Sequence, residues 1–287
     1  MKKNPTFLIK KASGEKEPFD IQKFKRSLKR CRATDKMIMS IARKIEKKPG
    51  IRTTKQIYAF ALKELEKYNP ALAARYNLKQ ALIALGPSGY PFERFIAQIF
   101  KAQGYQVKLN QISPGYCVDH EIDLTAIKRK KHYMIECKFH NRQKYKSDVK
   151  VSLYIKARFD DIEKAWNQDP MHGHEFHQAW VATNTKFTKQ AVDYSQCAGI
   201  ELLSWSRPKE NLPILIQKHT LYPITTLTSL SRSEQKALIK KEIVLCREIP
   251  KNEWALEQLG IPSRQRKQII KDVEELCKCN NELNNKH

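Results

Sequence analysis

Two short runs of alternating apolar and polar residues, at 121–127 and 132–139, flank four consecutive basic residues at 128–131. Alternation with a period of two is typical of half-buried β-strands, and a run of charges between two such strands indicates a turn. The sequence therefore predicts an antiparallel hairpin. This hairpin constrains the fold most, because its register decides which side chains lie on a common face.

The register follows from the turn. If Ile127 lies opposite His132, then Asp123 lies opposite Glu136, with Cβ atoms about 4.5–5.5 Å apart. Lys138 is two residues beyond Glu136, and side chains alternate between the two faces of a strand. We therefore expect two carboxylates and one ammonium group on the same face.

Two opposed carboxylates repel each other unless a cation lies between them. Mg²⁺ prefers oxygen ligands and is commonly held by one or two carboxylates together with water and phosphate. The pattern thus indicates a metal site that can activate water beside a phosphodiester, with a lysine to position that water. On spacing alone a second interpretation stays open, because the same residue types also form ordinary solvated faces with weak ion pairs.

The order of several segments resembles the PD-(D/E)XK nucleases, in particular the Mrr-type restriction endonuclease family, over about residues 87–210. The segments are residues 92–93, 104–107, 121–123, 135–138, 179–188 and 199–205. The resemblance implies a DNA-cleaving site in which Asp123 and Glu136 bind Mg²⁺ or Mn²⁺. Lys138 would aid the attacking water, and Glu93, on a preceding helix, would assist. Many Mrr-type proteins carry Gln where Glu136 stands, so the acid here departs from that pattern.

Residues 1–86 begin with a strand-like run that ends at Lys10, followed by a turn at Gly14 and a second short strand. Asp20 can cap a helix that starts near Ile21, because its side chain can accept from the first free backbone N–H groups. Further helices are predicted at 35–47, 54–68 and 70–85. The expected unit is a β-hairpin followed by a small helical bundle.

This first unit resembles the ATP-cone domain. The pattern is carried by residues 9–11, 14, 18–20, 23–24 and 27–28, with 57–58 and 74–76 in later helices. The resemblance implies that the unit binds ATP or dATP and that Lys10, Lys11 and Lys23 face the nucleotide phosphates. On the residues alone, these lysines also fit a general basic surface.

In residues 87–212, helices are predicted at 91–103, 152–168 and 188–197 and strands at 106–109, 178–183 and 200–204. Gly104 is expected to end the first helix. Leu153, Ala157, Ile162 and Trp166 are expected in the core. Tyr154, Lys156 and Arg158 are expected on the surface of the same helix, and a role in lining a DNA groove stays open for them. A strand, a helix and a strand in succession predict a parallel pair, and hence a mixed sheet covered by helices.

Residues 213–287 are predicted to be helical. The apolar spacing from Leu227 to Val244 weakly resembles a helix-hairpin-helix unit, although serine, leucine and arginine replace its usual glycines. A second helical pair is expected from Trp254 to Leu276. A cap over the nuclease sheet or a dimer surface explains this region equally well, so a homo-oligomer stays open.

Composition supports an anionic partner, since 54 Lys and Arg against 30 Asp and Glu give a formal net charge of +24. Such a charge favours nucleic acid through counterion release, although surface lysines also serve solubility. Seven cysteines without a C-x-x-C pair predict reduced thiols in a cytoplasmic protein. No apolar run reaches membrane-spanning length. His172, His174 and His177 are interpreted as loop residues rather than a zinc site.

Taken together, the sequence predicts an α/β chain with three parts. A restriction-endonuclease-like mixed sheet flanked by helices, at 87–212, follows an ATP-cone domain at 1–86 and precedes a small helical domain at 213–287. The leading hypothesis is a restriction-like, metal-dependent DNA endonuclease whose activity is regulated by ATP or dATP. The alternative is a nucleotide-sensing DNA-binding regulator without nuclease activity.

Overall fold

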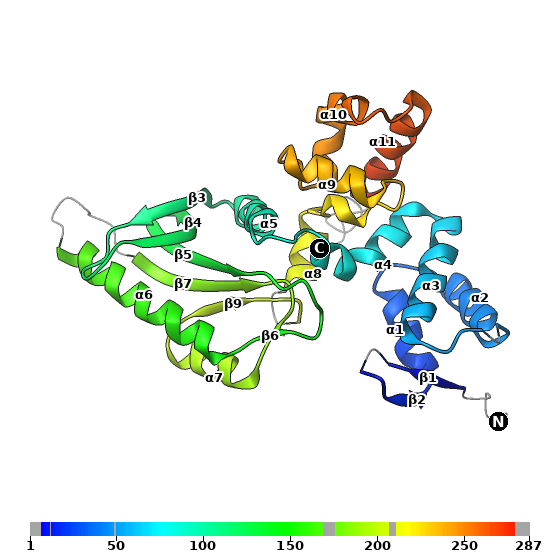
Figure 1. Cartoon of the computed structure of the whole chain (residues 1–287), viewed down its shortest axis with the longest axis horizontal. Coiled ribbons are helices and arrows are strands. Elements are labelled where there is room, and N and C mark those ends of the chain that lie inside the picture. Colours follow the sequence, from blue (N-terminus) through cyan, green and yellow to red (C-terminus); the bar gives the residue numbers. More distant parts are fainter. Residues whose placement is uncertain (1–6, 12, 49, 169–175, 207–210, 279–287) are drawn as a thin grey trace.

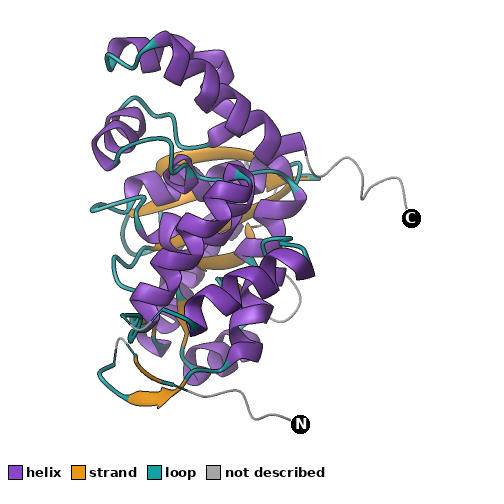
Figure 2. Cartoon of the chain, turned by 90° about the vertical axis from the view of Figure 1, so that its right-hand side faces the viewer, coloured by secondary structure: helices purple, strands orange, loops and turns teal. Residues whose placement is uncertain are grey.

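The structure is a computed structural model that describes residues 7–278, apart from residues 12, 49, 169–175 and 207–210 (Figure 1). The predicted loop with His172 and His174 therefore lies outside the described residues. Figure 2 shows the short N-terminal hairpin at one end of the molecule, separated by helices from the larger sheet. In the described part of the chain, no helix is both long and apolar enough to cross a bilayer.

The N-terminal region is a hairpin on a helical bundle, as predicted. Strands β1 (Leu8–Lys10) and β2 (Lys16–Pro18) pair antiparallel, and Gly14 adopts φ +92° in the turn between them. Helix α1 (Ile21–Lys29) starts at Asp20, whose carboxylate accepts from the backbone N–H groups of the second and third helical residues. The remaining helices are α2 (Asp35–Glu46), α3 (Thr54–Tyr68) and α4 (Pro70–Ile83).

The central unit is a five-stranded mixed sheet in the order β3-β4-β5-β7-β9. Its strands are β3 (Gln106–Ser113), β4 (His120–Lys128), β5 (Lys131–Lys138), β7 (Phe176–Thr183) and β9 (Glu201–Leu203). The first three strands are antiparallel, and β5, β7 and β9 are parallel. The predicted strand–helix–strand unit is confirmed: α7 (Lys189–Cys197) links β7 to β9. A separate short parallel pair joins β6 (Lys146–Ser147) and β8 (Lys186–Phe187).

Helices cover both faces of this sheet (Figure 1). Helix α5 (Tyr90–Ala102) packs in a core with Leu124 and Ile135, whereas α6 (Val149–Gln168) and α7 pack in another with Met134 and Val181. Alternate residues of β5 thus enter opposite cores, as strand geometry requires. Helix α5 ends before Gly104, which adopts φ +84° as predicted.

The hairpin of β4 and β5 has the predicted register, with Ile127 opposite His132. Its turn is shorter than predicted, because Lys128 and Lys131 still pair in the ladder. The two turn residues, Arg129 and Lys130, have φ of 50° and 64°. Positive φ at both central residues is the signature of a type I′ turn, whose twist matches that of the strands.

Two of the four core residues predicted for helix α6 are confirmed, because Ile162 is buried and Trp166 packs against the same core, and two are wrong. Leu153 and Ala157 are exposed, and Arg158, expected at the surface, is buried. The core residues are Ser152, Ile155, Phe159 and Ile162. The inner face follows the apolar spacing of Ile155, Phe159 and Ile162. Arg158 is buried beside this face, where its guanidinium pairs with the buried carboxylate of Glu136.

The C-terminal region is helical, as predicted. It comprises α8 (Leu212–Lys218), η1 (Ile224–Thr226), α9 (Arg232–Lys240), η2 (Cys246–Asn252), α10 (Glu253–Gln258) and α11 (Ser263–Lys278). Helix α9 starts with a capping box, in which Ser231 and Glu234 satisfy each other's backbone N–H groups. The core of this region is continuous with that of α5 and the sheet.

Helix α4 belongs to two cores. Leu72 and Ala73 lie in the N-terminal core, whereas Leu78 and Leu82 lie in the core that includes α5, the sheet and the C-terminal helices. Figure 1 shows α4 between α3 and the C-terminal region. The hydroxyl of Thr225 also donates to the carbonyl of Ala81 over 2.7 Å. A helix with apolar residues on two faces must be covered on both, so α4 ties the three regions together.

Truncation of Leu82 tests this shared core. Leu82→Ala removes a side chain that is 0% exposed, and we expect a loss of about 2–5 kcal/mol in the free energy of unfolding. Leu153→Ala is the matched control, because Leu153 is 47% exposed and its truncation is expected to change stability by no more than about 0.5 kcal/mol. Urea denaturation measures both, and equal losses would contradict the assigned packing of α4 and α6.

Candidate active site

The ends of β4 and β5 bring together the three residues that the hairpin register predicts to share a face. The Lys138 ammonium lies 2.6 Å from Glu136 Oε1. Asp123 Oδ2 accepts a 2.7 Å hydrogen bond from the backbone N–H of Cys137, directly after Glu136. Ile135 and Cys137 are buried in the opposite core, as expected. The alternation of β5 thus separates the charged face from the apolar one.

Glu93 joins this group from the first turn of α5. Burial, followed by the negative charges of Asp123 and Glu136, raises the pKa of Glu93 to about 7. The charge of Lys138 also acts on Glu93, in the opposite direction. The four predicted residues therefore lie within range of one another's charges, although they come from three elements.

Asp123 is perturbed in the same direction. Burial, followed by the charge of Glu136, raises the pKa of Asp123 to about 6, while the hydrogen bond from the Cys137 N–H opposes this shift. Two neighbouring carboxyl groups thus retain protons much closer to neutral pH than free Asp and Glu side chains do. Such clusters occur at functional sites, where a cation or a substrate relieves the repulsion.

Arg158 is a member of the site that the sequence interpretation missed. Its guanidinium Nη1 donates over 2.9 Å to Glu136 Oε2, and Glu136 is only 5% exposed. The Arg158 guanidinium also lies 5.3 Å from the centre of the Tyr154 ring. One signal could have revealed it: Arg158 falls at helical spacing between Ile155 and Ile162, and a buried arginine requires an anionic partner.

The donor set fits a hard divalent cation held by few protein ligands. Within the described ranges, no three His, Cys, Asp or Glu side chains already form a metal cage. Asp123 and Glu93 are close, partly buried carboxyls, which suits Mg²⁺ coordinated mainly by water and phosphate. Glu136 is engaged by Lys138 and Arg158, so it would bind a metal by exchanging one of these contacts.

The three lysines predicted to face nucleotide lie on the hairpin and on α1. Lys10 is exposed, and its backbone N–H donates to the Arg52 carbonyl over 2.7 Å. The Lys11 ammonium lies 2.6 Å from Glu17 and also pairs with Glu15, while Lys23 lies 3.8 Å from its capping residue Asp20. Lys10 and Lys11 are thus neighbours on one hairpin, and Lys23 lies at the start of the adjoining helix.

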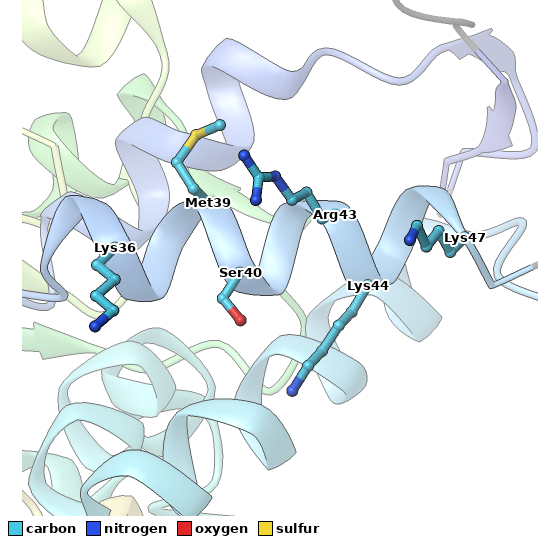
Figure 3. Close-up of a pocket in the computed structure, with 6 residues that line it drawn as sticks. All are labelled: Lys36, Met39, Ser40, Arg43, Lys44 and Lys47. Atoms are coloured by element: carbon cyan, nitrogen blue, oxygen red, sulfur yellow. The ribbon is translucent and has the colours of Figure 1, made fainter.

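A further basic surface, which we call the α2 surface, lies along helix α2. It forms a hollow lined by Lys36, Met39, Ser40, Arg43, Lys44 and Lys47 (Figure 3). Figure 3 shows Lys44 on the same side of the helix as Ser40, and Arg43 beside Met39. Lys44 also pairs with the buried Glu64. Basic residues three to four apart could have revealed this surface in the sequence.

Three family models match the chain in succession. The ATP cone domain matches residues 7–80, the restriction endonuclease catalytic domain of the Mrr type matches residues 86–157, and the AF1548-like C-terminal domain matches residues 222–277. The first two agree with the resemblances noted from the sequence. The third describes the C-terminal helices by their likeness to AF1548.

A curated relative supports this assignment. An uncharacterized protein from Archaeoglobus fulgidus is 36% identical over 183 residues, which are 63% of this chain and 99% of the relative. The crystal structure of AF1548, a protein of unknown function, aligns with 34% identity and a TM-score of 0.54 over 67% of this chain and 99% of that one. Can2 from Sulfobacillus thermosulfidooxidans, in complex with cyclic tetra-adenylate, aligns with 12% identity and a TM-score of 0.33 over 71% of this chain and 62% of Can2, a likeness too low to support an argument.

The relative, the solved structure and the order of the matching models agree. The mixed sheet with helices on both faces is the expected restriction-endonuclease-like fold. The chain therefore belongs to the AF1548-like family and combines an N-terminal ATP-cone domain with an Mrr-type restriction-endonuclease domain.

Proposed function

We propose that this protein is a restriction-like, metal-dependent DNA endonuclease that hydrolyses phosphodiester bonds and whose ATP-cone domain binds ATP or dATP. In this proposal residues 1–86 bind nucleotide, residues 87–212 cut DNA and residues 213–287 form a helical support. One observation carries the proposal: Glu93, Asp123, Glu136 and Lys138 converge within a domain of the restriction-endonuclease type. A protein that only binds DNA has no need of such a cluster.

Each residue has a chemical role in the proposal. A bound divalent ion such as Mg²⁺ would polarise the scissile phosphate and acidify water. Asp123 and Glu136 would hold this ion and Glu93 would add a third carboxylate. Lys138, which lies 2.6 Å from Glu136 Oε1, would be released when this oxygen binds the ion. Its ammonium group would then position the attacking water and offset the charge that develops on the phosphate. Arg158 would retain the second oxygen of Glu136 and so fix its orientation.

The charge of the chain supports DNA as the partner. A net charge of +24 attracts a polyanion, and the α2 surface provides a concentrated part of it. Contacts of lysine and arginine with phosphates bind DNA largely without regard to sequence and weaken as salt concentration rises. They therefore support DNA binding that weakens as the salt concentration rises.

Replacement of Asp123 tests the proposed catalytic site. Asp123→Asn keeps the shape of the side chain but removes a negative charge, so we expect metal-dependent cleavage of plasmid DNA to fall by about 100-fold or more. Asp193→Asn is the matched control, because Asp193 is an exposed residue of α7. Equal cutting by the wild-type protein and Asp123→Asn would reject the site, and the regulator without nuclease activity would replace this proposal.

The raised pKa values of Glu93, about 7, and Asp123, about 6, predict a pH dependence. Both carboxyls bind protons more tightly in the folded chain than in the unfolded one, where their pKa is about 4. The metal-free protein should therefore lose stability as pH rises from about 4 to about 7. Mn²⁺ should bind progressively better over pH 5.5–7.5, because it competes with these protons.

Thermal unfolding and calorimetric titration with Mn²⁺ measure the two halves of this prediction. We expect added Mn²⁺ to raise the melting temperature more at pH 8 than at pH 5.5, and the pH dependence to diminish in Asp123→Asn. Mn²⁺ affinity that does not change over this range would show that the two carboxyls do not bind the ion.

The nucleotide assignment depends on the lysines of the hairpin and α1. We expect the double variant Lys10→Ala and Lys23→Ala to bind ATP at least about tenfold more weakly, because hydrogen bonds to charged groups contribute about 1.5–3 kcal/mol each. A double variant of two exposed C-terminal lysines, Lys236→Ala and Lys251→Ala, removes the same charge elsewhere. Fluorescence titration with an ATP analogue measures both, and equal affinities would refute the assignment.

A further inference from the structure

The connection between α4 and α5 passes directly against the end of the strand that carries the proposed site. Gly86 has no room for a side chain, because a Cβ atom there would lie 2.6 Å from Cε1 of Phe139 and 2.5 Å from the Ser88 carbonyl. Phe139 follows Lys138 in the chain, and its ring lies 5.9 Å from that of Phe92, which precedes Glu93. Backbone from the junction thus lies against Phe139, the neighbour of Lys138, and the Phe139 ring in turn packs near Phe92, the neighbour of Glu93.

Asn184 makes a second and more specific connection. This side chain is 1% exposed and lies in the loop between β7 and β8. Its Oδ1 accepts from the His140 N–H over 2.9 Å, and its Nδ2 donates to the His140 carbonyl over 2.8 Å. One amide therefore satisfies both backbone groups of the residue that lies two positions after Lys138, and fixes the path of the chain there.

The same Nδ2 group also reaches α4, where it donates to the carbonyl of Leu82 over 3.4 Å. The last four carbonyls of a helix have no partner within the helix, so an outside donor is required when they are buried. Asn184 supplies that donor to the last turn of α4 (Pro70–Ile83). Because an asparagine amide has two N–H donors, it can serve both carbonyls at once.

The other side of α4 belongs to the ATP-cone domain. Leu72 and Ala73 pack in its core, and the Tyr58 hydroxyl of α3 lies 2.6 Å from Asn77 Oδ1. A helix is a stiff element, so a shift of its packed face displaces its last turn as well. Such a displacement would therefore reach the loop after β5 through the hydrogen bond between Asn184 and the Leu82 carbonyl.

We propose that Asn184 is a positioning residue that couples α4 to the strand bearing Glu136 and Lys138. Nucleotide binding to the ATP-cone domain would act on this strand through the hydrogen bonds of Asn184 to Leu82 and His140. This inference rests on the proposed function, since it assumes that the N-terminal domain binds nucleotide and that the strand end is the site. The inference adds to the proposed function the residue through which the N-terminal domain would act on the end of this strand.

Hydrogen–deuterium exchange of the full chain, with and without saturating ATP, tests the proposal. In the wild-type protein we expect ATP to change the exchange rate of the His140 amide by about fivefold or more, the lower end of typical coupling between sites. Asn184→Ala should remove this change while ATP still binds. If Asn184 had only a structural role, Asn184→Ala would instead raise the exchange rate of this amide equally with and without ATP. The response to ATP would then persist in the variant.

A second variant covers the case in which Asn184→Ala does not fold. Gly86→Ala leaves Asn184 in place, but its methyl group would lie 2.6 Å from Cε1 of Phe139. The chain at Phe139 and His140 must then shift relative to Asn184, so the same response should be reduced. Gly50→Ala is its matched control, because a Cβ atom at Gly50 meets no atom within 4 Å. We expect Gly50→Ala to respond to ATP as the wild-type protein does.

The outcomes separate this inference from the proposed function. The inference would be overturned if the His140 amide still responded to ATP in Asn184→Ala and Gly86→Ala. It would also be overturned if the wild-type protein bound ATP without any response of this amide, or did not bind ATP. A response that depends on Asn184, in a protein that cuts no DNA with Mg²⁺ or Mn²⁺, would support the coupling and reject only the nuclease assignment.

Discussion

The buried carboxylate of Glu136 is the constraint on which the central part of the structure depends. An ionised group that leaves water must be paired and hydrogen-bonded, or the fold is strongly destabilised. Lys138 supplies one partner from the same strand and Arg158 supplies the other from α6. The second contact ties α6 to the end of β5, beside the inner face that Ser152, Ile155 and Phe159 form.

Local rules predicted the elements that depend on neighbouring residues. The hairpin register followed from the alternation around residues 128–131, and Asp20 was identified as a cap from its type and position. Helix α3 has the bounds that the sequence predicted. These features need no knowledge of distant partners, because periodicity and capping act within a few residues.

The features missed at and beside the site depend on distant partners. Arg158 appeared to be a surface residue because nothing near it in the sequence shows that Glu136 lies against it. Asn184 was noted only as part of a resemblance, and its contacts join His140 and Leu82, 44 and 102 residues away. The site itself was predictable where one hairpin builds it. The resemblance, rather than spacing, indicated that Glu93 would join it from another helix.

The two-sided burial of α4 has a consequence for how such a protein can arise by gene fusion. The glycine- and proline-containing stretch before α5 has the composition of a linker between two domains. If gene segments were exchanged at this stretch, Leu78 and Leu82 would be separated from the core that they share with α5 and the C-terminal helices. Recombination that preserves both folds must therefore carry α4 together with the downstream segment, or recreate its apolar surface. The border between the two hydrophobic cores runs through a helix and not through a linker.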